Sequence, residues 1–252
     1  MITNGRLLDQ QAELRLIPVR GLPEVREGDD LGTLIAQAAR LEDGDIVVVA
    51  HKVVSKAEGR VVRLAEVEPS PQARDLADGE DPRRLEVILQ ESTRLVRTRP
   101  PLVIAETRHG FVCASAGVDA SNAPERDALV LLPLDPDASA DRLRGRLQEL
   151  AARDVAVVVS DSFGRAWRQG TTDVAIGCAG LRPLLDLAGE RDPTGYGLHA
   201  TVIAVADEIA AAAELVRGKL DRVPVAIVRG LEARGSGSAR ELVMPPERDL
   251  FR

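Results

Sequence analysis

The stretch VAVVVSDSFGRAWRQG, residues 155–170, joins an apolar, valine-rich run to a polar segment that begins abruptly at Ser160. The run 155–159 is short and bounded by turn residues, which is typical of a strand buried on both faces of a sheet. The segment 160–170 then projects from the carboxyl end of that strand, a common place for active-site loops. The stretch therefore predicts a sheet with a functional loop at its edge.

Similar patterns flank this stretch along the whole chain. Further apolar runs bounded by turn residues predict strands at 46–50, 102–105, 128–132, 201–206 and 223–228. Apolar residues at helical spacing, preceded by acidic caps or Pro82, predict helices at 30–40, 81–97, 139–152 and 207–218. Segments rich in Pro, Gly and Asp at 67–82 and 181–197 predict long surface connections. This mixture predicts an α+β (mixed α/β) fold, with either a mixed or a doubly wound sheet.

Composition narrows the class of protein. A chain of 252 residues with 44% hydrophobic content can bury a large core without disulfides. Acidic residues outnumber basic ones by 40 to 33 and aromatics make up 2%, which disfavours nonspecific nucleic-acid binding and base stacking. We find no signal-peptide pattern and no apolar run of about 20 residues, so we expect a cytoplasmic protein without a membrane partner. Cys113 and Cys178 lie among small apolar residues and are expected to be buried thiols.

Common signatures of phosphate and hydrolase chemistry do not occur. The chain has no GxxxxGK[ST], GxGxxG, GxSxG or HExxH motif. His51, His109 and His199 are too scattered to indicate a zinc site. A nucleotide site in this chain must therefore be built in another way.

The segment SDSFGRAWRQG holds the strongest local signal. Asp161 and Ser162 supply hard oxygen ligands, and Arg165 and Arg168 supply cations suited to phosphate or carboxylate. A turn with surface arginines, in which Trp167 covers the core, is the competing interpretation.

The segment AGVDASN, residues 116–122, provides a second carboxylate. Gly117 permits a tight turn, so that Asp119 and Asn122 point into one pocket. An ordinary surface turn has the same composition. If the two loops meet, Asp119 and Asp161 would hold magnesium or manganese while the ion bridges nucleotide phosphates.

Two basic segments complete the candidate site. HKVVSKAEGR, residues 51–60, brings Lys52 and Lys56 together in a turn able to bind phosphate, although a strand pair with solvated lysines has the same pattern. An alanine-rich helix is followed by Arg217, Lys219 and Arg222, which suit either an anion site or ordinary helix capping.

Taken together, these segments resemble the coenzyme F420-0:γ-glutamyl ligase family in its single-domain form. The resemblance runs from PVRGLPEVREGDDL at Pro18 through HKVVSKAEGRVV, ESTRLVR, ETRHGFVCASAGVDASN, SDSFGRAWRQGTTDVAIGCAGLRPLLDLAGERDPTG and ADEIAAAAELVRGKLDRVPVAIVRG, ending at Gly230. It implies one ligase domain over 1–230, in one or two subdomains, and a C-terminal extension over 231–252. It also implies a mixed sheet, an intertwined homodimer and no attached flavin-dependent reductase domain.

The activity that the resemblance implies is GTP-dependent addition of L-glutamate to F420-0 through an acyl phosphate, with Mg²⁺ or Mn²⁺ and with K⁺. A ligase or phosphohydrolase for another substrate, and a non-catalytic deazaflavin- or nucleotide-binding protein, are the alternatives. The alternative enzymes would use the same acidic pair, Asp119 and Asp161.

The resemblance also assigns roles to residues. The matched metal ligands are Asp119, Asp161 and Ser162, together with Lys219 where some members offer a neutral oxygen. The matched nucleotide contacts are Leu22, Pro23, Glu24, Val25, His51, Lys52, Lys56, Asn122, Arg217, Gly218, Lys219, Leu220, Asp221, Arg222, Val223 and Pro224. Lys56 and Arg165 are the expected catalytic cations, because they would stabilise charge on the transferred phosphoryl group.

Overall fold

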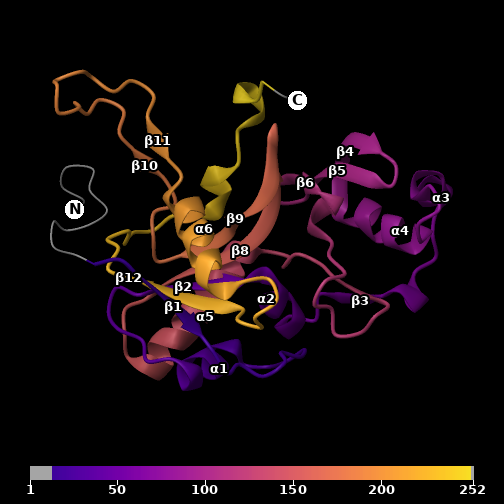
Figure 1. Ribbon diagram of the computed structural model, residues 1–252, viewed down its shortest axis with the longest axis horizontal. Helices are drawn as coiled ribbons and strands as arrows, with labels where there is room; N and C mark the ends of the chain where they lie inside the picture. The colour runs from indigo at the N-terminus through magenta and orange to yellow at the C-terminus, as the bar shows by residue number, and fades with distance from the viewer. Residues whose placement is uncertain (1–12, 251–252) are drawn as a thin grey trace.

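The computed structural model describes residues 13–250, which build a mixed five-stranded sheet with helices on both faces (Figure 1). The strand order is β1 (Arg15–Val19), β12 (Val225–Arg229), β2 (Ile46–Ala50), β8 (Ala156–Arg165) and β9 (Arg168–Ala179). β2 and β8 are parallel, and every other neighbouring pair is antiparallel. The α+β class and the mixed sheet expected from the sequence are confirmed, and the doubly wound alternative is wrong.

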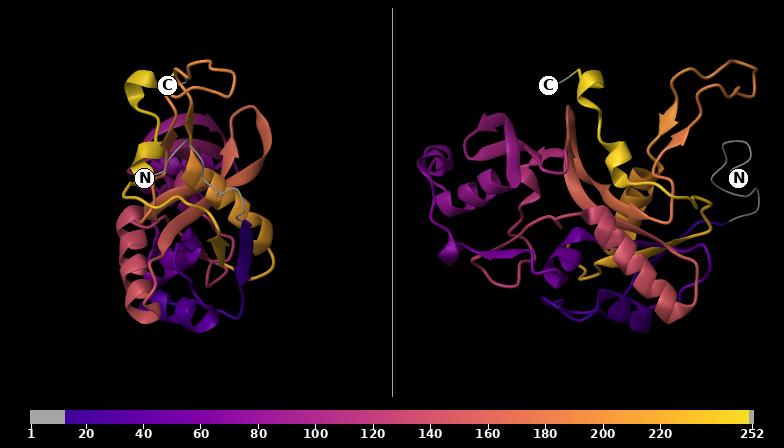
Figure 2. Two further views of the ribbon diagram at one scale, coloured as in Figure 1. Left: turned by 90° about the vertical axis from the view of Figure 1, so that its left-hand side faces the viewer. Right: turned by 180° about the vertical axis from the view of Figure 1, so that it is seen from behind.

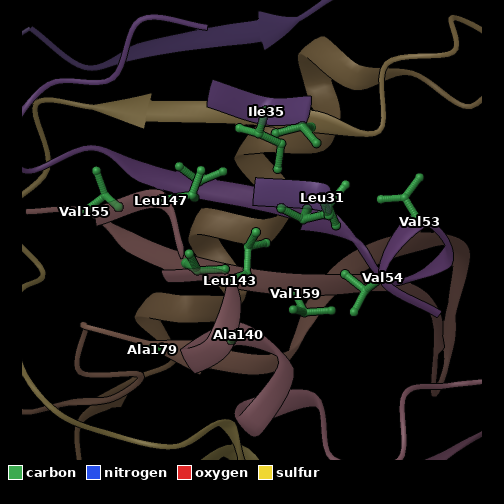
Figure 3. Packing of buried hydrophobic residues seen from close by; sticks show 14 of the residues in the cluster. Leu31, Ile35, Val53, Val54, Ala140, Leu143, Leu147, Val155, Val159 and Ala179 are labelled. Carbon is green, nitrogen blue, oxygen red and sulfur yellow. The ribbon is translucent and has the colours of Figure 1, made fainter. Parts of the chain in front are cut away.

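The central strands are buried on both faces, because helices cover each side. Val47 and Val49 of β2 belong to a cluster with residues of α1 (Leu31–Ala38), α2 (His51–Ala57) and α5 (Pro136–Ala151). Figure 3 shows residues from these three helices packed together. Ile46 and Val48 alternate with these valines along β2 and pack on the other face with α6 (Val205–Arg217). Side chains alternate between the faces of a strand, so a continuous apolar run such as IVVVA serves two cores at once.

Local sequence explains where the helices begin. Asp30 caps α1 by accepting from the Thr33 N–H at 3.0 Å, and Asp135 caps α5 by accepting from the Ala138 N–H at 3.1 Å. Pro136 follows as the first residue of α5, where its missing N–H costs nothing. The same pattern of a polar cap followed by proline opens α3 (Pro71–Ala77) and α4 (Pro82–Glu91).

A second unit lies beside the sheet and has its own core (Figure 2). It contains the three-stranded sheet β4 (Ser92–Arg99), β5 (Leu102–Thr107) and β6 (Val112–Ala114). It also contains the pair β3 (Val61–Arg63) and β7 (Ala128–Val130), the helices α3 and α4, and the 3₁₀ turns η2 (Leu64–Glu66) and η3 (Ser115–Gly117). Its apolar residues form a cluster separate from the two clusters of the main sheet.

The remaining segments pack around the main sheet. The pair β10 (Leu185–Asp186) and β11 (Val202–Ile203) carries a long loop away from the body of the molecule (Figure 1). Residues 231–250 include η4 (Ala239–Leu242) and η5 (Pro246–Arg248), and the buried Ala233 and Ala239 join the core under α6. Within residues 13–250, no helix has the length and apolar character needed to cross a membrane.

Several sequence expectations are wrong in detail. The predicted helix 81–97 stops at Glu91, because 92–99 forms β4 and pairs with β5. The predicted strand 201–206 shrinks to β11, since Val205 and Ala206 begin α6. The supposed connection 67–82 contains α3. For residues 92–99, pairing with β5 overrides the local helical pattern, whereas α3 begins with the polar cap and proline described above.

Candidate active site

A cavity of about 650 Å³ opens at the carboxyl ends of β2 and β8, beside the start of β12. Loops and helices from distant parts of the chain converge there. It is lined by Leu22, Pro23, Glu24, Val25, Ala50, His51, Lys52, Val53, Lys56, Asn122, Ala123, Pro124, Ser160, Asp161, Ser162, Asp173, Glu214, Arg217, Gly218, Lys219, Leu220, Arg222, Val223 and Pro224.

Helix α2 places basic side chains inside this cavity. HKVVSKA begins directly after β2, so the predicted turn and the alternative of solvated lysines are both wrong: Lys52 and Lys56 are buried in a helix. Each lysine has a carboxylate partner. Lys56 Nζ lies 2.5 Å from Glu24 Oε1, and Lys52 Nζ lies 2.6 Å from Asp119 Oδ2. A buried ammonium needs such a partner or an anionic ligand.

Asp119 and Asp161 lie against adjacent residues of α2. Asp119 accepts hydrogen bonds from Lys52 Nζ and from the Ser121 N–H, both at 2.6 Å. Asp161 Oδ1 lies 3.2 Å from His51 Nε2 and accepts from the Ser162 N–H at 2.8 Å. Lys52 and His51 are neighbours in the chain, so the two acidic segments are brought to the same turn of one helix.

Asp119 is ionised in this setting. Burial acts to raise its pKa, but the hydrogen bonds from Lys52 and Ser121, together with the Lys52 charge, outweigh burial and hold the pKa below its usual value. The Asp119 carboxylate itself lies just outside the lining of the cavity, whereas Lys52 forms part of the wall.

A buried polar cluster behind Asp161 was missed by the sequence analysis. Asp173 of β9 accepts from Ser162 Oγ at 2.6 Å and from Ser160 Oγ at 2.9 Å, and it pairs with Arg217 Nη2. Arg217 also lies 3.3 Å from Glu214 Oε2. Desolvation and then the nearby Asp173 charge raise the pKa of Glu214. The spacing of Glu214 and Arg217 on one helix face was the available signal.

The segment 160–170 is a hairpin and not the projecting loop that the sequence predicted. β8 continues to Arg165 and pairs with β9, which places Ser162 opposite Asp173. Trp167, at the turn, is 82% exposed, so its predicted role as a cover over the core is wrong. The hairpin rises away from the sheet (Figure 2).

The structure brings most of the predicted site residues to the cavity wall. The exceptions are Asp119, described above, Asp221, Arg165 and Arg168. Arg165 lies near the hairpin tip and donates from Nη2 to the Gln169 carbonyl at 2.9 Å. Its catalytic role stays a prediction.

The turn after α6 depends on glycine. Gly218 has φ of 64°, and a Cβ atom built there would lie 2.3 Å from Asp221 Oδ2. A side chain would therefore meet backbone strain, and the Asp221 side chain would have to move away. This turn directs Lys219 and Arg222 to the cavity wall.

The oxygen ligands available for a metal ion are few. No group of three or more His, Cys, Asp or Glu side chains suited to a metal occurs in the described part of the chain. Asp161 and Ser162 line the cavity, with Asp119 behind Lys52. Carboxylate and hydroxyl oxygens suit Mg²⁺ or Mn²⁺, whereas the ammonium of Lys219 suits an anion.

Comparison with known proteins identifies the family. The model of a family described as F420-0:Gamma-glutamyl ligase matches residues 21–230. This chain belongs to that ligase family. A coenzyme F420:L-glutamate ligase from Methanopyrus kandleri is 49% identical over 247 residues, which cover 95% of this chain and 98% of that protein. Proteins of the same name from Methanothermobacter thermautotrophicus and Archaeoglobus fulgidus are 47% and 43% identical, over 95% of this chain and 99% and 96% of theirs.

The family membership confirms the resemblance seen in the sequence. In this F420-0:γ-glutamyl ligase family member, the match begins at the loop that carries Leu22 and Glu24 and ends just after β12. Those limits enclose every residue of the cavity wall.

Proposed function

We propose that this chain joins L-glutamate to coenzyme F420-0 through an amide bond, using GTP and a divalent metal ion. The observation that carries the proposal is the cavity, where buried cations gather at the carboxyl ends of two parallel strands. The similarity to proteins named coenzyme F420:L-glutamate ligase supports the choice of acceptor and amino acid.

The proposed reaction has two steps. A carboxylate oxygen of F420-0 attacks the γ-phosphorus of GTP, and GDP leaves. The amine of glutamate then attacks the carbonyl carbon of the acyl phosphate, loses a proton and displaces phosphate. Charge develops on phosphoryl oxygens in the first step, and we assign its stabilisation to Lys56 and Arg217, which both line the cavity.

Nucleotide binding is assigned to the wall that surrounds these cations. The loop with Leu22 and Glu24 lies on one side, and the turn from Gly218 to Pro224 lies on another. Asn122, with φ of 57°, enters from the second unit. We propose that these segments hold the base, the ribose and the phosphates of GTP.

Metal binding is assigned to Asp119, Asp161 and Ser162. When bound, Mg²⁺ or Mn²⁺ would neutralise charge on the β- and γ-phosphates. Lys52 Nζ lies against Asp119 Oδ2 in this structure, so a cation that uses this oxygen has to displace the ammonium. A requirement for K⁺ and a homodimeric assembly belong to the same proposal, and light scattering tests the second.

The experiment that tests the function is an assay with F420-0, L-glutamate, GTP and Mn²⁺, with and without K⁺, followed by mass analysis of the product. We expect F420-0 to gain glutamate residues, with GDP and phosphate formed in step. GTP consumed equally well without F420-0 or glutamate would indicate a phosphohydrolase. Tight binding without a glutamylated product would indicate a binding protein, and either result would overturn the proposal.

A further inference from the structure

Asp173 lies at the centre of the buried cluster, and its carboxylate is fully engaged. The residue is 4% exposed. Oδ1 accepts from Ser162 Oγ, and Oδ2 accepts from Ser160 Oγ and from Arg217 Nη2. One carboxylate on β9 thus links the strand that carries Asp161 to the end of helix α6.

The contact with Asp173 fixes the direction of the Ser162 hydroxyl hydrogen bond. A hydroxyl has one hydrogen, and that of Ser162 is donated to Asp173 at 2.6 Å. The Ser162 oxygen can therefore offer lone pairs to the cavity but no donor. That is the arrangement a cation ligand or a hydrogen-bond acceptor requires.

Arg217 is held by the same carboxylate, but not all of its N–H groups have a hydrogen-bond partner. Its Nη2 is used by Asp173 and Ser160, whereas Nε and Nη1 are buried without a hydrogen-bond partner among the described residues. Arg217 is 2% exposed and lies in the cavity wall. Buried donors are nearly always satisfied, so two open N–H groups on a fixed guanidinium indicate an oxyanion bound in the working state.

We propose that Asp173 is a positioning residue of this site. It keeps the Ser162 oxygen as a pure acceptor and fixes the Arg217 guanidinium so that its open N–H groups meet different phosphate oxygens of the nucleotide. The inference rests on the proposed function, because the oxyanion is taken to be part of GTP.

The test compares Asp173→Asn with Asp45→Asn. Asp45 is a second buried aspartate of the same sheet, paired with Arg229 at the opposite end of β2. Each variant is assayed for kcat and for the KM of GTP, for GDP affinity by calorimetry with Mg²⁺, and for thermal unfolding. We expect D173N to weaken GDP binding and raise the KM of GTP by about tenfold or more, as loss of an outer-shell partner commonly does. D45N is expected to lower only the melting temperature.

A D173N protein that is less stable but binds GDP as tightly as the wild type would overturn the proposal, as would equal losses of GDP affinity in D173N and D45N. If D173N does not fold, Ser162→Ala tests the same idea, because unchanged kinetics and GDP affinity in S162A would also overturn it. Failure of the wild type to glutamylate F420-0 would refute the proposed function alone, since the GDP titrations still separate the two aspartates.

Discussion

The two ends of the five-stranded sheet each bury an aspartate–arginine pair, and the pairs differ in how completely they are satisfied. At the amino end of β2, Arg229 donates from Nε and Nη2 to Asp45 at 2.7 and 2.8 Å, and from Nη1 to Glu42 at 2.7 Å. At the carboxyl end, Arg217 has one nitrogen engaged and two open. We call Asp45–Arg229 the closed pair, because all three guanidinium nitrogens of Arg229 donate hydrogen bonds within the protein. We call the other end of the sheet, with Asp173 and Arg217, the open end, because two nitrogens of Arg217 have no hydrogen-bond partner within residues 13–250 and remain free to bind a ligand at the cavity wall.

This contrast distinguishes an ion pair that only stabilises the fold from an ion pair that also binds a ligand. Both ends pair a buried aspartate with an arginine, so the charges alone do not decide the role. The count of open donors does, because an unpaired buried N–H lowers stability unless a ligand completes it. The following predictions test that distinction from the largest expected effect to the smallest.

Removal of the closed pair should affect stability most. Arg229→Met leaves Asp45 buried without its cation, and we expect the free energy of unfolding to fall by about 3 kcal/mol, near the low end for a broken buried pair since Arg229 is partly exposed. Denaturant unfolding measures the change. The KM of GTP should stay at the wild-type value in the same preparation, and a large rise would mean that both ends of the sheet serve the ligand.

Removal of a cation at the open end should affect activity more than stability. Lys56→Met deletes the charge that we propose to lie against the transferred phosphoryl group, and we expect kcat/KM for GTP to fall by about 100-fold. Steady-state kinetics with F420-0 and glutamate measure the loss. Glu24→Gln is the matched control, because it removes the charge of the exposed partner of Lys56 and keeps the lysine. Equal losses in both variants would show that the ion pair, and not the cation, is needed.

The Lys52–Asp119 pair should make stability depend on acid pH. The folded protein lowers the pKa of Asp119, so this carboxylate contributes stability above its unfolded pKa and loses that contribution as the pH falls through the folded pKa. Lys52→Met removes the charge and a hydrogen bond that lower the pKa. We therefore expect the variant to lose less stability than the wild type between about pH 5 and pH 2, measured by thermal unfolding. Parallel pH curves for the two proteins would contradict this.

The smallest expected effect is on the reactivity of the two buried cysteines, Cys113 and Cys178. Burial raises the pKa of both cysteine thiols to about 12, with Asp161 adding to the effect at Cys113 and Asp137 at Cys178. Neither thiol should react with a thiol-specific reagent in the native protein at pH 8, because the thiolate is the reactive form. Both should react after unfolding. Rapid reaction of Cys113 alone in the native protein would show that the packing around this thiol is loose.

Much of the main sheet was predictable, because its central strands carry their own signal. The expected strand 46–50 is β2 as observed, and 155–159 and 223–228 fall within one or two residues of the start of β8 and β12. Continuous runs of valine and isoleucine leave few alternatives to burial between two layers. The helix at 139–152 likewise overlaps α5.

The errors occurred where local pattern and tertiary pairing disagree. Residues 92–97 continue the helical spacing of α4, yet they pair with β5 across a hairpin. The segment HKVVSKA has two β-branched valines and resembles a turn or strand, yet it forms α2 because its apolar side packs into the main core. The long β8–β9 hairpin was missed for the same reason, since its register depends on the partner strand.

The sequence by itself determined the fold class, the family and many of the residues that line the cavity, because buried runs and motif segments are local in the chain. Ser160, Asp173 and Glu214 of the cavity wall were not predicted. The tertiary structure alone decided which charges meet. Lys52 and Asp119 are 67 residues apart, and Arg217 and Asp173 are 44 apart. Such pairs form only when strand order and register bring their elements together, and no local pattern encodes that distance. The role of Asp173 therefore emerges from the folded chain.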